Sequence, residues 1–204
     1  MEQLDNLKDI WKNQNESVIR FTEDDIYKMV HKRSSSVVKW ILIISILEFV
    51  LPNIFFLFSD FKSTKEVYES YGLNNIMLFY TVVHVVIILG FIYYFYKNYR
   101  NISADSSVKS LLHDILKTRS TVKYYIYYNL SIAAIIGLHV FYIVFNSDVF
   151  INKLPENTSM IGIWVIAILL FGIALLLFWV FYRIIYGFLL KKLQRNYKEL
   201  NHKD

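Results

Sequence analysis

The chain has 204 residues, of which 55% are hydrophobic and 18% aromatic, and its mean hydropathy is +0.36. This composition is too apolar for ordinary soluble domains, and the lack of cysteine excludes disulfides and thiolate metal sites. The net charge of +5 comes from basic residues beside apolar blocks, so we interpret it as a topology signal and expect no direct nucleic-acid binding.

Residues 1–39 are mostly polar and contain two helical patterns. The first is a narrow apolar stripe at helical spacing, Leu4, Leu7 and Trp11. We expect this stripe to contact lipid, the rest of the chain or a protein partner. Further along, Thr22 and Asp25 form a capping-box pattern, which predicts a second helix over 22–33 on the inner leaflet.

Four long apolar blocks follow this segment. They cover residues 40–58, 75–96, 124–145 and 160–182. Each block is long enough to cross a hydrocarbon core about 30 Å thick as a single helix. The predicted fold class is therefore all-α, an integral-membrane four-helix bundle. Its helices form two tandem hairpins, 40–97 and 124–186, each preceded by a cytoplasmic amphipathic helix.

The basic residues predict the orientation of these helices. Of the 22 lysines and arginines, only three lie in the connections within the hairpins: Lys62, Lys65 and Lys153. Cytoplasmic loops retain basic residues, so we predict a multi-pass protein of the bacterial inner membrane with both termini in the cytoplasm. Aromatic residues near the predicted inner boundary agree with this orientation. They are Trp40, Tyr93, Tyr94, Tyr96, Tyr124, Tyr125, Trp179 and Tyr182.

The segment 98–123 between the hairpins contains an apolar face at helical spacing. That face is formed by Val108, Leu111, Leu112 and Ile115. We expect it to belong to a helix on the inner leaflet and to contact lipid or a protein partner. The chain then ends in a basic cytoplasmic tail, 187–204, that faces the anionic lipid of the bilayer.

The two halves of the chain also resemble each other. The sequence RSSSVVKW precedes the first span, and RSTVKY precedes the third. This similarity predicts a tandem duplication that yields two parallel hairpins. In the second half, Ala133 and Gly137 fall near the position equivalent to Glu48, and their small size suits close contact between helices.

The run IISILEFVLP places one carboxyl group, that of Glu48, inside the first span. It lies about nine residues beyond Lys39, or roughly 13 Å into the membrane. An ionised carboxylate at that depth costs about 3 kcal/mol or more unless a neighbour compensates it. His84 in the second span is the preferred partner because it is similar in depth and belongs to the same hairpin, and His139 is a secondary candidate.

Three interpretations of Glu48 remain open. A Glu48–His84 hydrogen bond can lock two helices together, or the pair can form a site that responds to protons or binds a metal ion. Alternatively, a neutral Glu48 faces water or a defect in the lipid. The sequence contains no glycine-rich phosphate loop, zinc-ligand spacing or nucleophile elbow, so we predict no catalytic residues, metal or cofactor.

The stretches LKDIWKNQ and DDIYKMVHKRSSSVVKWILIISILEF, with the four-span layout, resemble a family of uncharacterised inner-membrane proteins from flavobacteria and related Bacteroidetes. Members of that family are often encoded beside alternative sigma factors, which implies a membrane regulator that binds a sigma factor. Some members are labelled beta-carotene oxygenase, which implies an iron site held by several histidines. Only His84 and His139 lie within the predicted spans of this chain.

These observations support three functional hypotheses. The first is a noncatalytic membrane scaffold or regulator that acts through its cytoplasmic helices. The resemblance implies an anti-sigma-like form of this hypothesis, and a homo-oligomer is a further expectation. The second is a membrane metal oxygenase that uses His84, His139 and Glu48. The third is a small proton-coupled transporter that uses Glu48 and His84.

Overall fold

A computed structural model of the chain describes residues 22–58, 61–104 and 107–201. These residues form four long helices and no β-strand: α2 (Glu23–Leu57), α4 (Asn74–Ala104), α5 (Val108–Phe145) and α7 (Met160–Asn201). Short helices α3 (Phe61–Ser70) and α6 (Asp148–Ile151) lie in the connections within the two hairpins. Each long helix is long and apolar enough to cross a membrane. The all-α four-helix fold of a multi-pass membrane protein is confirmed.

Local sequence signals explain where α2 and α5 begin. The Thr22 side chain accepts a hydrogen bond from the backbone N–H of Asp25, and the Asp25 carboxylate accepts one from the backbone N–H of Thr22. This is the predicted capping box, which provides partners for two otherwise unpaired N–H groups. Ser107 caps α5 in the same way by accepting from the backbone N–H of Ser110, at 3.2 Å.

The segments 22–33 and 108–119 do not form separate helices on the membrane surface. They are the first turns of α2 and α5, because neither glycine nor proline interrupts the chain over residues 23–51 or 108–136. The burial of Leu111 and Ile115 in the bundle corrects the expectation that these two side chains contact lipid or a partner.

The apolar side chains of the segment 108–119 differ in how deeply they are buried. Leu111 and Ile115 are fully buried in the bundle, Leu112 packs against the core, and Val108 stays exposed. The helix continues because its buried face continues into the first turn. The predicted stripe of Leu4, Leu7 and Trp11 lies outside the described residues.

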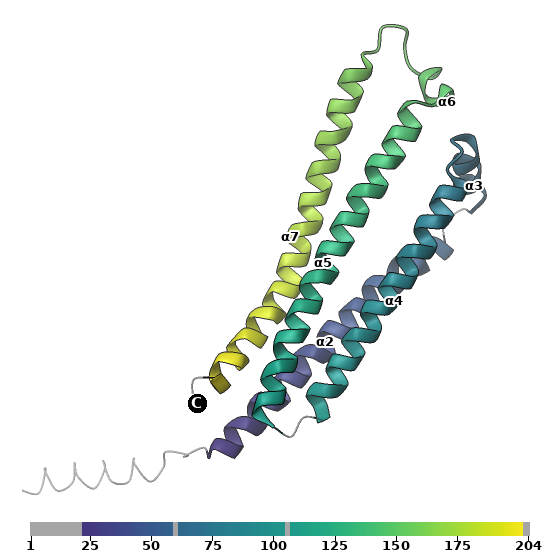
Figure 1. Ribbon diagram of the computed structural model, residues 1–204. Helices are drawn as coiled ribbons and strands as arrows, with labels where there is room; N and C mark the ends of the chain where they lie inside the picture. The colour runs from purple at the N-terminus through teal and green to yellow at the C-terminus, as the bar shows by residue number, and fades with distance from the viewer. Residues whose placement is uncertain (1–21, 59–60, 105–106, 202–204) are drawn as a thin grey trace, which may run out of the picture.

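Figure 1 shows α3 and α6 at one end of the bundle, and the first turns of α2 and α5 beside the last turns of α4 and α7 at the other. We call this second end the basic end, because the sequence places most lysines and arginines there. Most of the core lies in the half of the bundle near the basic end. Its buried apolar residues include Val30, Val38, Ile41, Phe95, Ile102, Leu111, Ile115, Val122, Tyr186 and Leu193.

Large apolar side chains cover much of the remaining helix surface. Phe55, Leu78 and Ile161 are among those exposed, and such side chains occur on all four long helices. A soluble protein rarely exposes so large an apolar surface, whereas lipid tails solvate it without cost. The exposure pattern therefore agrees with membrane insertion of all four helices.

Gly137 marks a close approach between α5 and α7. A Cβ atom added at Gly137 would lie 2.2 Å from Cζ of Phe171, far inside van der Waals contact. The predicted role of a small residue at this position in close helix contact is confirmed. The ring of Phe171 occupies the space that any other residue at position 137 would need.

This contact yields a stability prediction. Gly137→Ala should lower the free energy of unfolding by about 1–3 kcal/mol, because the methyl group overlaps the Phe171 ring. Gly172→Ala is the matched control, since no atom lies within 4 Å of its added carbon. We expect the control to unfold at the parent temperature or above when both variants are heated in detergent. Equal stability of Gly137→Ala and Gly172→Ala would contradict the close approach, because both variants gain the same helix propensity.

Candidate functional site

The carboxyl group of Glu48 is bound by two tyrosines of the second hairpin. The Tyr125 hydroxyl of α5 donates to Glu48 Oε2 at 2.6 Å, and the Tyr186 hydroxyl of α7 donates to the same oxygen at 3.1 Å. Both tyrosines are almost completely buried. The other carboxyl oxygen, Oε1, is also buried and accepts no hydrogen bond from the described residues. One acid thus joins three helices, with one acceptor atom still available.

The two histidines predicted beside Glu48 have tyrosine partners of their own. His84 Nδ1 lies 3.4 Å from the Tyr128 hydroxyl, and the two rings are stacked. His139 Nδ1 lies 2.7 Å from the Tyr80 hydroxyl. We predicted that His84 is the hydrogen-bond partner of Glu48. That prediction was wrong, because tyrosines from α5 and α7 bind the carboxyl group instead. The two residues do lie around one cavity.

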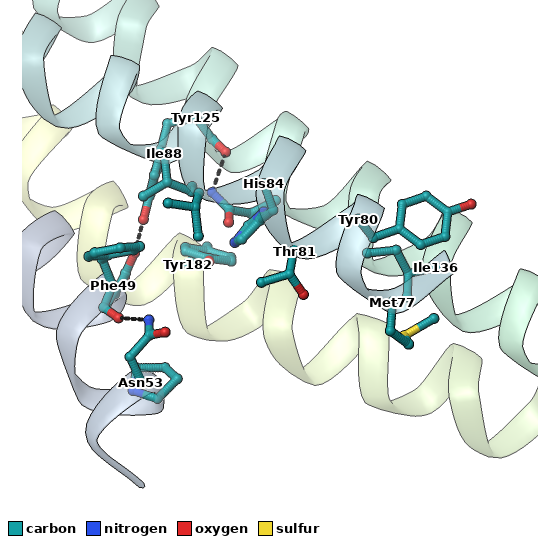
Figure 2. A pocket seen from close by; sticks show the side chains of 14 residues that line it. Phe49, Asn53, Met77, Tyr80, Thr81, His84, Ile88, Tyr125, Ile136 and Tyr182 are labelled. Atoms are coloured by element: carbon teal, nitrogen blue, oxygen red, sulfur yellow. Dashed lines mark hydrogen bonds between the residues drawn. The ribbon is translucent and has the colours of Figure 1, made fainter. Parts of the chain in front are cut away.

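The cavity has a volume of about 270 Å³ and is lined by all four long helices. Figure 2 shows His84, Thr81 and Tyr182 around this space, with Phe49 and Asn53 of α2 on one side. Further lining comes from Glu48, Pro52, Met77, Tyr80, Val85, Ile88, Tyr125, Asn129 and Ile136. The predicted intramembrane polar residues are thus part of one mixed polar and aromatic chamber.

A second cavity of about 260 Å³ adjoins the first on the side of α5 and α7. The two share His84, Asn129, Ile136 and Tyr182, and the second adds mainly apolar residues such as Phe178. The shared residues place His84 and Tyr182 between the two cavities.

An aromatic cluster lies between the first cavity and the basic end. The Tyr125 ring makes edge contacts with Phe91, Phe95, Tyr182 and Tyr186, with ring centroids 5.4 to 6.4 Å apart. Such edge-to-face pairs add specific attraction to the burial of the rings. The cluster holds the Tyr125 hydroxyl in position towards Glu48.

Pro52 changes the backbone next to Glu48. It lies inside α2, four residues after Glu48, and proline has no N–H to donate. The helical hydrogen bond to the backbone carbonyl of Glu48 is therefore missing. The carbonyl and the carboxyl group of Glu48 supply oxygen acceptors at one level of the bundle. A ligand that carries positive charge or N–H groups would complement them.

The arrangement does not fit a histidine-held iron site. His84 and His139 contact different tyrosines, and among the described residues no three His, Asp or Glu side chains lie close enough to hold one metal ion. Iron in the carotenoid-cleaving enzymes needs several histidine ligands around one point. We therefore assign no metal-dependent step to Glu48, His84 or His139.

Sequence reasoning missed the tyrosines of the site. We predicted that Tyr125 and Tyr182 lie at the membrane interface, but Tyr125 is buried and Tyr182 lines the cavity. The missed signal is a continuous helical face in α5. Its residues follow the buried positions 111, 115, 118 and 122, continue to Tyr125, and reach Asn129 in the cavity wall.

Comparisons with known proteins place the chain in a family. It belongs to the family described as Domain of unknown function (DUF8845), which matches residues 24–204. A search of curated proteins and a search of solved structures found no match. The family match covers all four long helices and every residue that lines the two cavities.

The bonds to Glu48 predict the effect of removing each hydroxyl. Tyr125→Phe and Tyr186→Phe should each lower the free energy of unfolding by about 1–3 kcal/mol, with the larger loss at the shorter Tyr125 bond. Tyr124→Phe is the control, since that side chain is 68% exposed. Thermal unfolding in detergent measures all three.

A combined variant tests the cause of the loss. Adding Glu48→Leu to the two tyrosine changes should recover much of the lost stability, because no buried carboxyl group then lacks a donor. If Tyr125→Phe is as stable as Tyr124→Phe, the bond to Glu48 does not hold the hairpins together.

Proposed function

We propose that the protein is a noncatalytic regulator or scaffold of the bacterial inner membrane that binds a cytoplasmic protein through the basic end. The observation that carries this proposal is the length of the helices. All four continue past their apolar blocks and pack as one bundle, with buried residues from Val30 in α2 to Leu200 in α7. A packed bundle of this kind presents a fixed surface, whereas loose tails would not.

Polar contacts between helices support a fixed arrangement at the basic end. The Asn196 amide of α7 donates to the Ser34 hydroxyl of α2 at 3.0 Å, and both side chains are fully buried. The hydroxyls of Ser35 and Ser103 lie 2.8 Å apart and join α2 to α4. The Ser34–Asn196 pair is the buried one, and a buried polar pair specifies which helix faces meet, because a shifted register leaves it unpaired.

The chemistry of the surface indicates the kind of partner. The last turns of α7 carry a groove lined by Phe188, Lys191, Lys192, Gln194, Arg195 and Lys198. Four cations beside an exposed aromatic ring favour an acidic protein surface that contributes an apolar side chain. A sigma factor is the partner that the resemblance to the flavobacterial inner-membrane proteins implies.

Charge reversal at the basic end tests the proposal. In native membranes with the C-terminus tagged, the paired changes Lys191→Glu and Arg195→Glu should reduce recovery of the partner about tenfold or more, through like-charge repulsion. The control pair, Lys65→Glu and Lys153→Glu, carries the same change in charge at the opposite end. It should leave recovery unchanged.

Reporter fusions after Asn101 and Glu66 show whether each variant keeps the parent orientation, because basic residues also set topology. With orientation unchanged, equal loss of partner in both variant pairs would contradict recognition through the basic end. A reporter that reads cytoplasmic at Glu66 in the parent would place the basic end outside the cytoplasm and exclude the proposal.

A further inference from the structure

We propose that the cavity beside Glu48 binds a small hydrophobic organic cation, with Glu48 as its counter-charge. This inference goes beyond the proposed regulatory function, because it concerns the centre of the spans and does not depend on what binds the basic end. Four features of the cavity support it: its charge, its available acceptors, its aromatic walls and its access.

The charge of the lining favours a cation. Among the residues that line the two adjoining cavities there is no lysine or arginine, and Glu48 is the single carboxylic acid. A cation bound in this site of low dielectric would stabilise the ionised form of Glu48, because water screens the attraction between the two charges poorly. An anionic ligand would meet repulsion from Glu48 and no permanent positive charge.

The acceptors of Glu48 are only partly used. Tyr125 and Tyr186 both donate to Oε2, while Oε1 is buried and receives no hydrogen bond from the described part of the chain. Pro52 also withholds the N–H that would normally bind the backbone carbonyl of Glu48. Because Oε1 has almost no exposed surface, a cation in the cavity acts on Glu48 through its charge and not through a direct hydrogen bond to that oxygen.

The walls suit the body of such a ligand. Phe49, Tyr80, Tyr125 and Tyr182 supply aromatic rings around the first cavity, and Phe178 lines the second. The faces of aromatic rings attract ammonium groups within about 6 Å of the ring centre. Apolar residues such as Val85, Ile88 and Ile136 also line the first cavity and can cover an aliphatic or aromatic substituent of the same molecule.

The size of the site sets an upper limit on the ligand. The first cavity, of about 270 Å³, is large enough for one benzene ring with an alkylammonium group. Thr81 and Asn53 line the first cavity and are exposed at the bundle surface, so the site is accessible to a molecule dissolved in the membrane.

A metal cation is the main alternative of the same charge. Hard metal ions require several oxygen ligands around one point, usually six or more for calcium. Glu48 provides the one carboxylate of the site, and no group of three His, Cys, Asp or Glu side chains that could hold a metal ion occurs among the described residues. The aromatic rings of the walls supply no oxygen ligands for a metal ion. They do attract an organic cation, which is weakly hydrated and loses little by leaving water.

The test uses benzyltrimethylammonium as the probe and the purified full-length protein in detergent. Binding of the radiolabelled probe is measured by equilibrium dialysis. Two competitors define the chemistry: neopentylbenzene has the same shape without the charge, and benzenesulfonate carries the opposite charge. We expect saturable binding near one probe per chain, with no displacement by either competitor at equal concentration.

Three variants place the binding in the cavity. Glu48→Gln removes the counter-charge and should raise the dissociation constant of the probe about tenfold or more. A tenfold change corresponds to about 1.4 kcal/mol of binding free energy. Thr81→Trp leaves the bonds of Glu48 intact and fills the cavity from an exposed position of α4, so it should also weaken binding. Glu66→Gln removes an exposed carboxylate from α3 and should bind as the parent does.

The outcomes separate clearly. Loss of binding in both cavity variants, with parent-like binding in Glu66→Gln, supports the site. If Glu48→Gln fails to fold, Thr81→Trp alone decides, because it changes neither Glu48 nor its tyrosine partners. The proposal is overturned if the parent shows no saturable binding, if neopentylbenzene competes as well as the unlabelled probe, or if folded cavity variants bind like the parent.

Discussion

The arrangement of the bundle depends on one buried acid and the two hydroxyl groups that bind it. A carboxyl group at the centre of a span has no water to bind, so it needs hydrogen-bond donors from neighbouring helices. Glu48 obtains them from Tyr125 and Tyr186, which both belong to the other hairpin. In lipid, apolar burial does not drive helices together, so polar bonds and close packing must determine which hairpin faces meet. The two bonds of Glu48 therefore join α2 to one particular face of the second hairpin.

The bonds to Glu48 divide the bundle into two parts with different properties. Towards the basic end, the aromatic cluster around Tyr125 continues into a core with buried polar pairs such as Ser34–Asn196. Towards the opposite end, the four helices enclose cavities with mixed polar and aromatic walls. A packed region suits a surface that a protein partner recognises, and an open region suits a small ligand. Glu48 is the side chain that joins α2 to α5 and α7. A ligand bound beside it would therefore change how the two hairpins pack against each other.

The sequence allowed the helices to be predicted because the signals for them are local. Four apolar blocks, the Thr22 capping box and the small Gly137 each depend on a few neighbouring residues, and the structure contains all of them. The tandem duplication remains a prediction. Helix ends were harder to predict: the segment with Leu111 and Ile115 has the composition of a surface helix, yet its buried face belongs to the bundle.

The partner of Glu48 was not predictable from depth and hairpin membership alone. His84 is similar in depth and belongs to the same hairpin, but which side chains meet depends on the rotation of each helix and on the length of each side chain. Tyrosine reaches far from its backbone and carries its hydroxyl at the tip, so Tyr125 and Tyr186 bind Glu48 from two other helices. In the sequence, Tyr125 and Tyr186 lie near the predicted inner boundary of the membrane. Tyrosines are common at that boundary for other reasons, so their position gave no sign that they bind Glu48.

Infrared difference spectroscopy of the Glu48 carboxyl group tests the central claim most directly. The stretching band of this group is identified as the signal that Glu48→Gln removes from the spectrum of the parent. If the tyrosine hydroxyls bind the carboxyl group, Tyr125→Phe should shift the band by removing the donor at 2.6 Å, and His84→Ala should leave it in place. A band that shifts with His84→Ala and not with Tyr125→Phe would contradict the account and make the histidine the partner of Glu48.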